Sequence, residues 1–139
     1  MSNFVIFDTS VLVEDFRTSF HEKRMAALDG VIRISSVVLA ELWRGASTLG
    51  ERGALQDLEK NHPILVPTAM NWLDSGRILR RIRSDRGFEP HKLRDLHFDL
   101  LIALTARSWG ARLITSNKAD FELIRKYKPF ELEIWPSRA

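Results

Sequence analysis

The segment Phe4-Val-Ile-Phe-Asp-Thr-Ser-Val-Leu-Val13 places a short apolar run directly before one acidic and two hydroxyl-bearing residues. Four apolar residues bounded by polar ones indicate a buried strand, and Asp8, Thr9 and Ser10 are residue types that begin helices. A buried strand followed by a helix is the unit from which parallel sheets are built. The segment therefore predicts an α/β fold in which Asp8 lies at the carboxyl end of a strand.

The same alternation of strands and helices continues along the chain. Further strands are expected at residues 31–34, 64–66, 112–115 and 132–135. Helices are expected at residues 18–28, 37–48, 51–60, 68–86, 95–109 and 118–127. This order predicts a mainly parallel central sheet of four to five strands flanked by helices. Because there is no internal repeat, low-complexity stretch or linker, we expect residues 1–139 to form a single domain.

The composition excludes several classes of protein. The 139 residues include no cysteine, which excludes a disulfide scaffold, a thiolate zinc site and a cysteine nucleophile. A hydrophobic fraction of 45% is too high for a disordered chain. No apolar run approaches the roughly 18–20 residues of a membrane span, and the first residues lack a basic leader segment. We therefore expect a cytoplasmic protein that has no membrane association.

Basic residues are concentrated in one stretch of the chain. The formal net charge is only +3, yet residues 77–94 contain seven basic and two acidic residues. On the helix expected at 68–86, Arg77, Arg80, Arg81 and Lys92 beyond its end can share one side, with Met70, Leu73, Ile78 and Ile82 buried on the other. We expect Arg77, Arg80 and Arg81 to hold the phosphate groups of a polyanion. The alternatives are a solvated surface or a face toward a protein partner.

Two strand ends carry oxygen-bearing side chains. Asp8 follows the first strand, and Asn117 and Asp120 follow the strand at 112–115. Ligands of open α/β sheets bind at the carboxyl ends of the strands, so these residues are candidates for a site. The structural alternative for Asp8 is a helix cap, although Thr9 and Ser10 can cap equally well.

Asp99 is the more informative acid. It lies in the segment Phe98-Asp-Leu-Leu-Ile-Ala-Leu-Thr-Ala106, which is apolar around the helix except for this carboxylate. A carboxylate in a buried helix is costly unless it is paired, hydrogen-bonded or bound to a metal ion. The alternative is an acid stabilised by the dipole of a nearby helix start.

Glu41 completes a set of four acids from separate segments. By itself it is explained as an exposed residue or as a partner of Arg44. Together with Asp8, Asp99 and Asp120 it provides hard oxygen ligands, which suit Mg²⁺ or Mn²⁺ better than zinc. Such a set predicts metal-assisted hydrolysis of a phosphodiester.

The acids occur in four recognisable segments. These are Phe7-Asp-Thr-Ser-Val-Leu-Val13, Ser35-Ser-Val-Val-Leu-Ala-Glu-Leu42, Asp99-Leu-Leu-Ile-Ala103 and Thr115-Ser-Asn-Lys-Ala-Asp-Phe121. In order and spacing they resemble the motifs of PIN-domain ribonucleases, in particular VapC toxins of VapBC toxin–antitoxin pairs. The resemblance implies a PIN-like (RNase H-like) fold and a Mg²⁺-dependent endoribonuclease with Asp8, Glu41 and Asp99 as metal-binding, catalytic acids.

The last of these segments departs from the commonest form of the family. Asn117 stands where many members have Asp, and Asp120 supplies an acid that others also carry. We expect Asp120 to be the fourth catalytic and metal-binding acid, with Asn117 and Ser10 as polar support. The resemblance also implies a homodimer, a cognate antitoxin that forms a hetero-oligomer with the toxin and blocks its acidic pocket, and an RNA substrate such as a tRNA or ribosomal RNA loop.

Two other functions are compatible with the same residues. One is a housekeeping RNA-processing nuclease that has no antitoxin. The other is a catalytically silent binding module in which Asp8 and Asp99 are structural caps, although the complete set of acids argues against it. Of the remaining side chains, Trp43 and Trp109 are expected in the core or in a dimer contact, and His97 at the surface or in a supporting role near Asp99.

Overall fold

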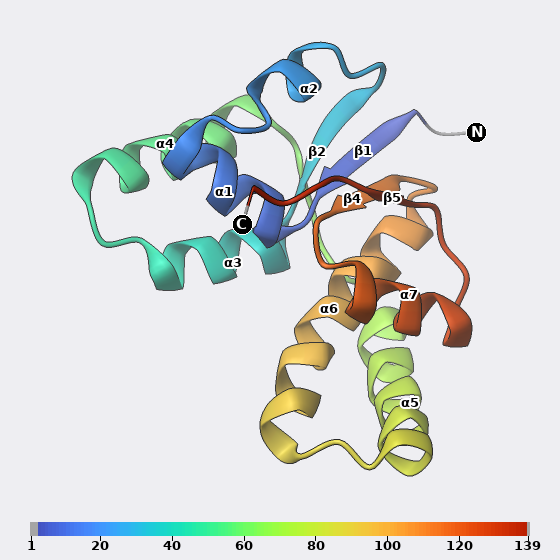
Figure 1. Cartoon of the computed structure of the whole chain (residues 1–139). Helices are drawn as coiled ribbons and strands as arrows, with labels where there is room; N and C mark the ends of the chain where they lie inside the picture. The colour runs from blue at the N-terminus through green and yellow to red at the C-terminus, as the bar shows by residue number, and fades with distance from the viewer. Residues whose placement is uncertain (1–2, 139) are drawn as a thin grey trace.

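The computed structural model describes residues 3–138, which alternate between strands and helices (Figure 1). The strands are β1 (Phe4–Phe7), β2 (Val31–Ser35), β3 (Ile64–Leu65), β4 (Arg112–Thr115) and β5 (Leu132–Ile134). The helices are α1 (Thr9–Thr18), α2 (Glu22–Ala26), α3 (Ser36–Gly45), α4 (Leu49–Asn61), α5 (Ala69–Arg86), α6 (Pro90–Ser108) and α7 (Lys118–Tyr127). The α/β fold expected from the sequence is confirmed.

The five strands form one parallel sheet in the order β3-β2-β1-β4-β5. The apolar strand β1 is therefore central, with Ile6 aligned to Arg33 on one side and to Leu113 on the other. Because the strands are parallel, their carboxyl ends share one edge of the sheet. Asp8 and Ser116 each directly follow a strand at this edge.

The helices fall into two groups that meet at this edge. In Figure 1, α1, α3 and α4 lie together beside the sheet, and α5, α6 and α7 form the lower part of the molecule. Helix α6 carries much of the core, since every residue from 100 to 106 is buried. Helix α3 contacts both α1 and α6. The two groups therefore bring side chains from α1, α3, α6 and α7 toward the end of β1.

Several helix boundaries differ from those expected. The helix expected at 18–28 is present only as the shorter α2, because α1 runs to Thr18 and Ser19, with a left-handed φ of 57°, separates the two helices. The helix expected at 37–48 ends at Gly45, because Thr48 caps the next helix through the backbone N–H of Glu51. Turn and cap chemistry decided both boundaries, rather than apolar periodicity.

Helices α5 and α6 differ from expectation in ways that matter for the site. Helix α6 begins at Pro90, five residues before the expected start, with proline in its favourable first position. In α5, Ile78 and Ile82 are buried as expected, but Met70 and Leu73 are exposed. The buried positions of its first half are polar, because Asn71 and Ser75 bond to the side chains of α6. No helix in residues 3–138 is long and apolar enough to cross a membrane.

Candidate active site

Asp8 is held at the end of β1 by its neighbours on both sides. Its backbone N–H donates to the carbonyl of Ile114 at 2.8 Å, and its carboxylate Oδ2 accepts from the hydroxyls of Ser10 and Thr115, each at 2.8 Å. Asp8 occupies the N-cap position of α1, but its side chain makes no capping hydrogen bond to that helix. Burial raises the pKa of the Asp8 carboxyl, and the two hydroxyl donors oppose that rise. Asp8 is a buried acid that is oriented by hydroxyl groups.

Glu41 approaches the same region from the middle of α3. It is partly buried, and its Oε1 accepts from the hydroxyl of Thr9 at 2.9 Å. Burial raises the pKa of Glu41, and the charge of Asp8 raises it further. The guanidinium of Arg44 lies over the ring of Phe98, 5.7 Å from its centroid, rather than on the Glu41 carboxylate. Glu41 is thus tied to α1 through Thr9.

Asp99 lies among the charges of the three other acids. Burial, and then the charges of Asp8, Glu41 and Asp120, raise its pKa to about 8. It lies in the third turn of α6, beyond the reach of a helix dipole, which falls off within the first turn. Among residues 3–138 no side chain or backbone group hydrogen-bonds to its carboxylate. Asp99 therefore has no structural explanation in this fold, whereas a cation beside it would offset the repulsion.

Asp120 is brought to the cluster by the first turn of α7, together with Asn117. The Asn117 side-chain oxygen caps α7 by accepting from the Asp120 backbone, and its amide nitrogen donates to Asp120 Oδ2 at 3.1 Å. Lys92 Nζ contacts both carboxylate oxygens of Asp120, at 2.7 and 2.9 Å. The expectation that Lys92 shares a side with the arginines of α5 is wrong, because it points to Asp120 instead.

Sequence reasoning missed three residues that shape the site. Thr9 and Thr115 orient the carboxylates of Glu41 and Asp8, and Lys92 neutralises Asp120. Lys92 lies two helical turns before Asp99, so the two share a face of α6. The seven-residue spacing between Lys92 and Asp99 is present in the sequence, but it has this meaning only if the helix begins at Pro90 rather than at residue 95.

The donor chemistry of the cluster suits a divalent cation. Asp8, Glu41 and Asp99 are carboxylates whose charges act on one another, and each has a raised pKa. Hard oxygen donors of this kind are preferred by Mg²⁺ and Mn²⁺. In residues 3–138, however, no three acidic or histidine side chains are already arranged as a ready metal site. The side chains fit the cation by charge and donor type, and binding requires them to turn toward one another.

The raised pKa of Asp99 predicts a pH-dependent stability in the presence of a chelator. The folded protein holds this proton up to about pH 8, whereas the ordinary pKa of an Asp side chain is 3.8. The stabilisation is therefore complete below the unfolded value and is lost as the pH rises through about 8. We expect the Tm in EDTA to fall by several degrees between about pH 6 and about pH 9, and to fall less for Asp99→Asn. Equal slopes for the two proteins would contradict this electrostatic description.

Comparison with known proteins places this arrangement in a family. Residues 5–127 match the family model of the PIN domain. The chain belongs to the PIN-domain family. The family resemblance expected from the four acidic segments is therefore confirmed, and the acids lie at the carboxyl edge of the PIN-domain sheet.

Solved structures share this fold over nearly their whole length. One is a chain of the DNA-bound VapBC complex from Salmonella typhimurium, with a TM-score of 0.71 and 23% identity over 97% of this chain and 99% of that one. Another is a chain of VapBC2 from Rickettsia felis, bound to a promoter DNA fragment, with a TM-score of 0.69 and 25% identity over 95% and 98%. A chain of VapBC-1 from nontypeable Haemophilus influenzae has a TM-score of 0.70 and 22% identity over 95% and 98%. No curated protein matches the chain.

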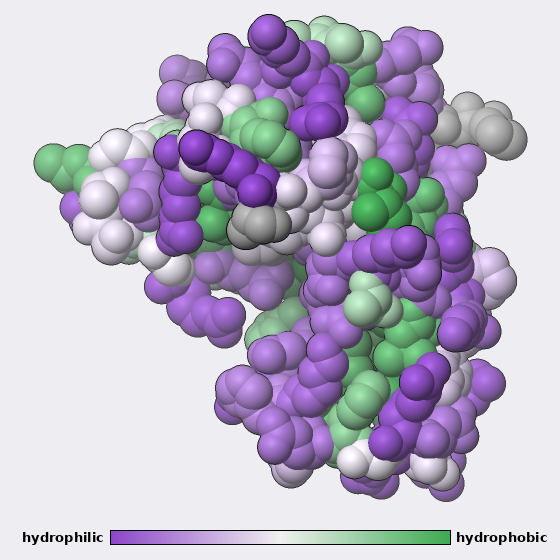
Figure 2. All heavy atoms as spheres, in the orientation of Figure 1, coloured by the Kyte–Doolittle hydropathy of each residue, from purple (hydrophilic) through white to green (hydrophobic). Residues whose placement is uncertain are grey.

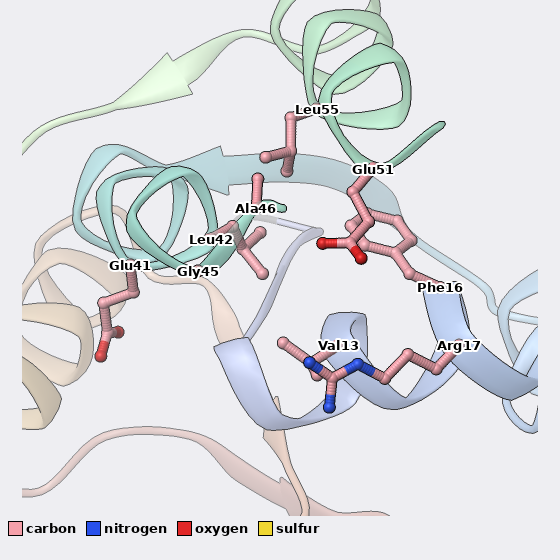
Figure 3. Close-up of a pocket in the computed structure, with 9 residues that line it drawn as sticks. All are labelled: Val13, Phe16, Arg17, Glu41, Leu42, Gly45, Ala46, Glu51 and Leu55. Carbon is pink, nitrogen blue, oxygen red and sulfur yellow. The ribbon is translucent and has the colours of Figure 1, made fainter. Parts of the chain in front are cut away.

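A groove lies beside the acids of this PIN domain, between α1, α3 and α4 (Figure 3). Its cavity volume is about 70 Å³. Its lining includes apolar side chains from all three helices, such as Val13, Leu42 and Leu55. Glu41 lies at one end of the groove, and Arg17 and Glu51 supply charges of both signs. The groove thus leads from an apolar surface to a carboxylate of the acidic cluster.

The basic residues of α5 lie at the surface of the PIN domain. Arg77 is exposed and pairs with Asp74 at 3.3 Å, and Arg81 lies 5.1 Å from the ring centroid of Tyr127 at the end of α7. Arg80 is exposed. All three can reach a ligand in solution, and their role toward RNA stays a prediction.

The other candidate side chains lie away from the acids. His97 bonds to Ser75 of α5 at 2.9 Å, and its ring meets that of Trp72 edge-on. His97 therefore supports the packing of α5 on α6. Trp109 is 46% exposed, so the expectation of a core position does not hold for it, and Trp43 is partly buried with its indole N–H donating to Glu59.

Proposed function

We propose that this PIN domain is a Mg²⁺-dependent endoribonuclease and the toxin of a type II toxin–antitoxin pair. The observation that carries the proposal is Asp99, a carboxylate with a pKa of about 8 and no hydrogen-bond partner within residues 3–138. Three further acids from β1, α3 and α7 act on it electrostatically. A fold does not retain such repulsion for stability, so the cluster is best understood as a site for a cation.

In this proposal Asp8, Glu41 and Asp99 hold the divalent ion. A Mg²⁺ ion bound there would activate water and stabilise the charge that develops on the phosphodiester oxygens. Ser10 and Thr115 fix the Asp8 carboxylate, and Thr9 fixes that of Glu41. Because these hydroxyls are anchored on β4 and α1, the two acids are oriented before the substrate arrives. Mn²⁺, which prefers the same donors, would substitute for Mg²⁺.

The proposed protein partner is a cognate antitoxin. VapBC complexes from Salmonella typhimurium and nontypeable Haemophilus influenzae contain chains of the same fold, and one neighbour is a toxin–antitoxin complex from Klebsiella pneumoniae. The groove between α1, α3 and α4 offers an apolar surface that ends at Glu41 (Figure 3). An antitoxin segment lying in this groove would cover the route to the acids. Toxin and antitoxin would then form a hetero-oligomer in the cytoplasm.

A second copy of the chain is the other proposed partner. Apolar side chains reach the surface in the lower part of the molecule, bordered by hydrophilic ones (Figure 2). Exposed apolar side chains are also found at the edge strand β3 and the start of α5, where four of them are between 44% and 59% exposed: Ile64, Val66, Met70 and Leu73. A homodimer would remove this apolar surface from water. Arg77, Arg80 and Arg81, which are exposed further along α5, are proposed to hold RNA.

The proposal is tested with purified protein and total RNA. The protein is stripped with EDTA and then incubated with RNA with and without Mg²⁺, and the new RNA ends are sequenced. We expect a small set of cleavage positions that form only when Mg²⁺ is added, because a selective ribonuclease reads unstacked loops. Cleavage that persists in EDTA would overturn the metal-dependent mechanism. Intact RNA at every Mg²⁺ and Mn²⁺ concentration would overturn the nuclease.

A further inference from the structure

Both carboxylate oxygens of Asp120 are already engaged by groups of this chain. Lys92 Nζ lies 2.7 Å from Oδ1 and 2.9 Å from Oδ2, and the Asn117 amide donates to Oδ2 at 3.1 Å. The Asp120 side chain is only 17% exposed, so little water competes with these donors. A divalent ion at Asp120 would have to displace the ammonium and would face an amide nitrogen beside it.

The ammonium is also part of the electrostatics of the whole cluster. Lys92 and Asp99 lie on one face of α6, and the Lys92 charge acts on Asp99 against the three neighbouring acids. Lys92 comes from α6 and Asp120 from α7, so the ion pair joins the two helices at the edge of the acidic cluster. The chain therefore places a positive charge of its own on the α7 side of the site, where Asn117 supplies a neutral amide.

We propose that Lys92 serves as the built-in second cation of this site, so that the site binds one divalent ion rather than two. The single ion belongs on the side formed by Asp8, Glu41 and Asp99, and Asp120 acts as the counter-ion of Lys92 instead of as a metal ligand. This inference rests on the proposed function, because it assigns the charges within the same metal site. Two-metal nucleases use their second ion to balance charge near the phosphate, and a fixed ammonium supplies a positive charge there without being lost to a chelator.

The inference is tested by counting ions bound to the full chain. EDTA-treated protein is titrated with Mn²⁺ alone, and the stoichiometry is measured by calorimetry and by the electron paramagnetic resonance signal of free Mn²⁺. We expect about one ion for the natural chain and about two for Lys92→Met, because the methionine keeps the length of the side chain and frees the Asp120 carboxylate. The double variant Lys92→Met/Asp120→Asn is expected to return to about one.

Matched variants separate this role from a structural ion pair. Lys126→Met removes an exposed lysine from the same helix as Asp120 and is expected to leave the stoichiometry unchanged. If Lys92→Met binds the same number of ions with the same affinity as the natural chain, Lys92 is only a structural partner. A stoichiometry of two Mn²⁺ ions on the natural chain would overturn the inference directly, whether or not the variants fold. Absence of Mn²⁺ binding by the natural chain and by Lys92→Met would instead contradict the proposed function.

Discussion

Replacing Asp99 by Asn is expected to slow RNA cleavage by at least about 100-fold while leaving the fold intact. Loss of an outer-shell partner of a metal ligand already costs about 10–100-fold, and Asp99 is proposed to be a ligand itself. The amide keeps the shape of the side chain but removes the charge that repels Asp8 and Glu41. The variant should therefore be at least as stable as the natural protein in EDTA. The measurement is the single-turnover cleavage rate at saturating Mg²⁺, together with the Tm.

Asp95→Asn is the matched control for this variant. Asp95 lies one turn earlier on the same helix, its side chain is 59% exposed and contacts His91 at 3.7 Å, and its charge is the smallest of the influences on the pKa of Glu41. Its replacement should change neither rate nor Tm appreciably, because surface ion pairs contribute little. A natural rate for Asp99→Asn would show that the acids are not the site of catalysis. A collapse of its Tm would show that Asp99 is structural after all.

Expression of the chain alone in a bacterium is expected to arrest growth, and expression of Asp99→Ala is not. An endoribonuclease without its inhibitor destroys RNA continuously, and loss of Asp99 removes the proposed metal site. Growth is followed after induction, and the amount of soluble protein is measured for both forms. Normal growth with abundant soluble natural protein would favour the alternative of a housekeeping nuclease or a silent module. Arrest by both forms would indicate toxicity unrelated to catalysis.

The fold was predictable where one local signal dominated. The strands β1 and β4 and the helix α7 lie where the sequence predicts them, because the apolar pattern and the residues that begin and end helices indicate the same bounds there. The helix expected at 18–28 begins later than predicted because Ser19 turns the chain with a positive φ, for which a serine gives no clear signal. The early start of α6 was missed because Pro90 was taken as a helix breaker rather than as a first helical residue.

The four acids of the site were predictable from the sequence, but the side chains that orient them were less so. Asp8, Glu41, Asp99 and Asp120 influence one another in the structure, as their placement at strand ends and in a buried helix suggested. The role of Thr115 depends on the pairing of β1 with β4, and that of Thr9 on the packing of α1 against α3; sequence periodicity does not contain that information. Met70 and Leu73 were expected to be buried because apolar side chains usually are, yet α5 packs on α6 through Asn71 and Ser75. Polar contacts with α6 thus replace the expected apolar ones in the first half of α5 only.

The pairing of β1 with β4 has a consequence for the order in which the protein is made. The ribosome synthesises β1 first, but the strand that pairs with its second edge is made only at residues 112–115. Three of the four acids are already present in the first hundred residues, while Thr115 and the carbonyl of Ile114 that hold Asp8 are still missing. Contacts between residues so distant in sequence form late in folding. A nascent chain of this length thus carries three of the four proposed metal-binding acids in an unassembled form, and the site is completed only after residue 115 has been made.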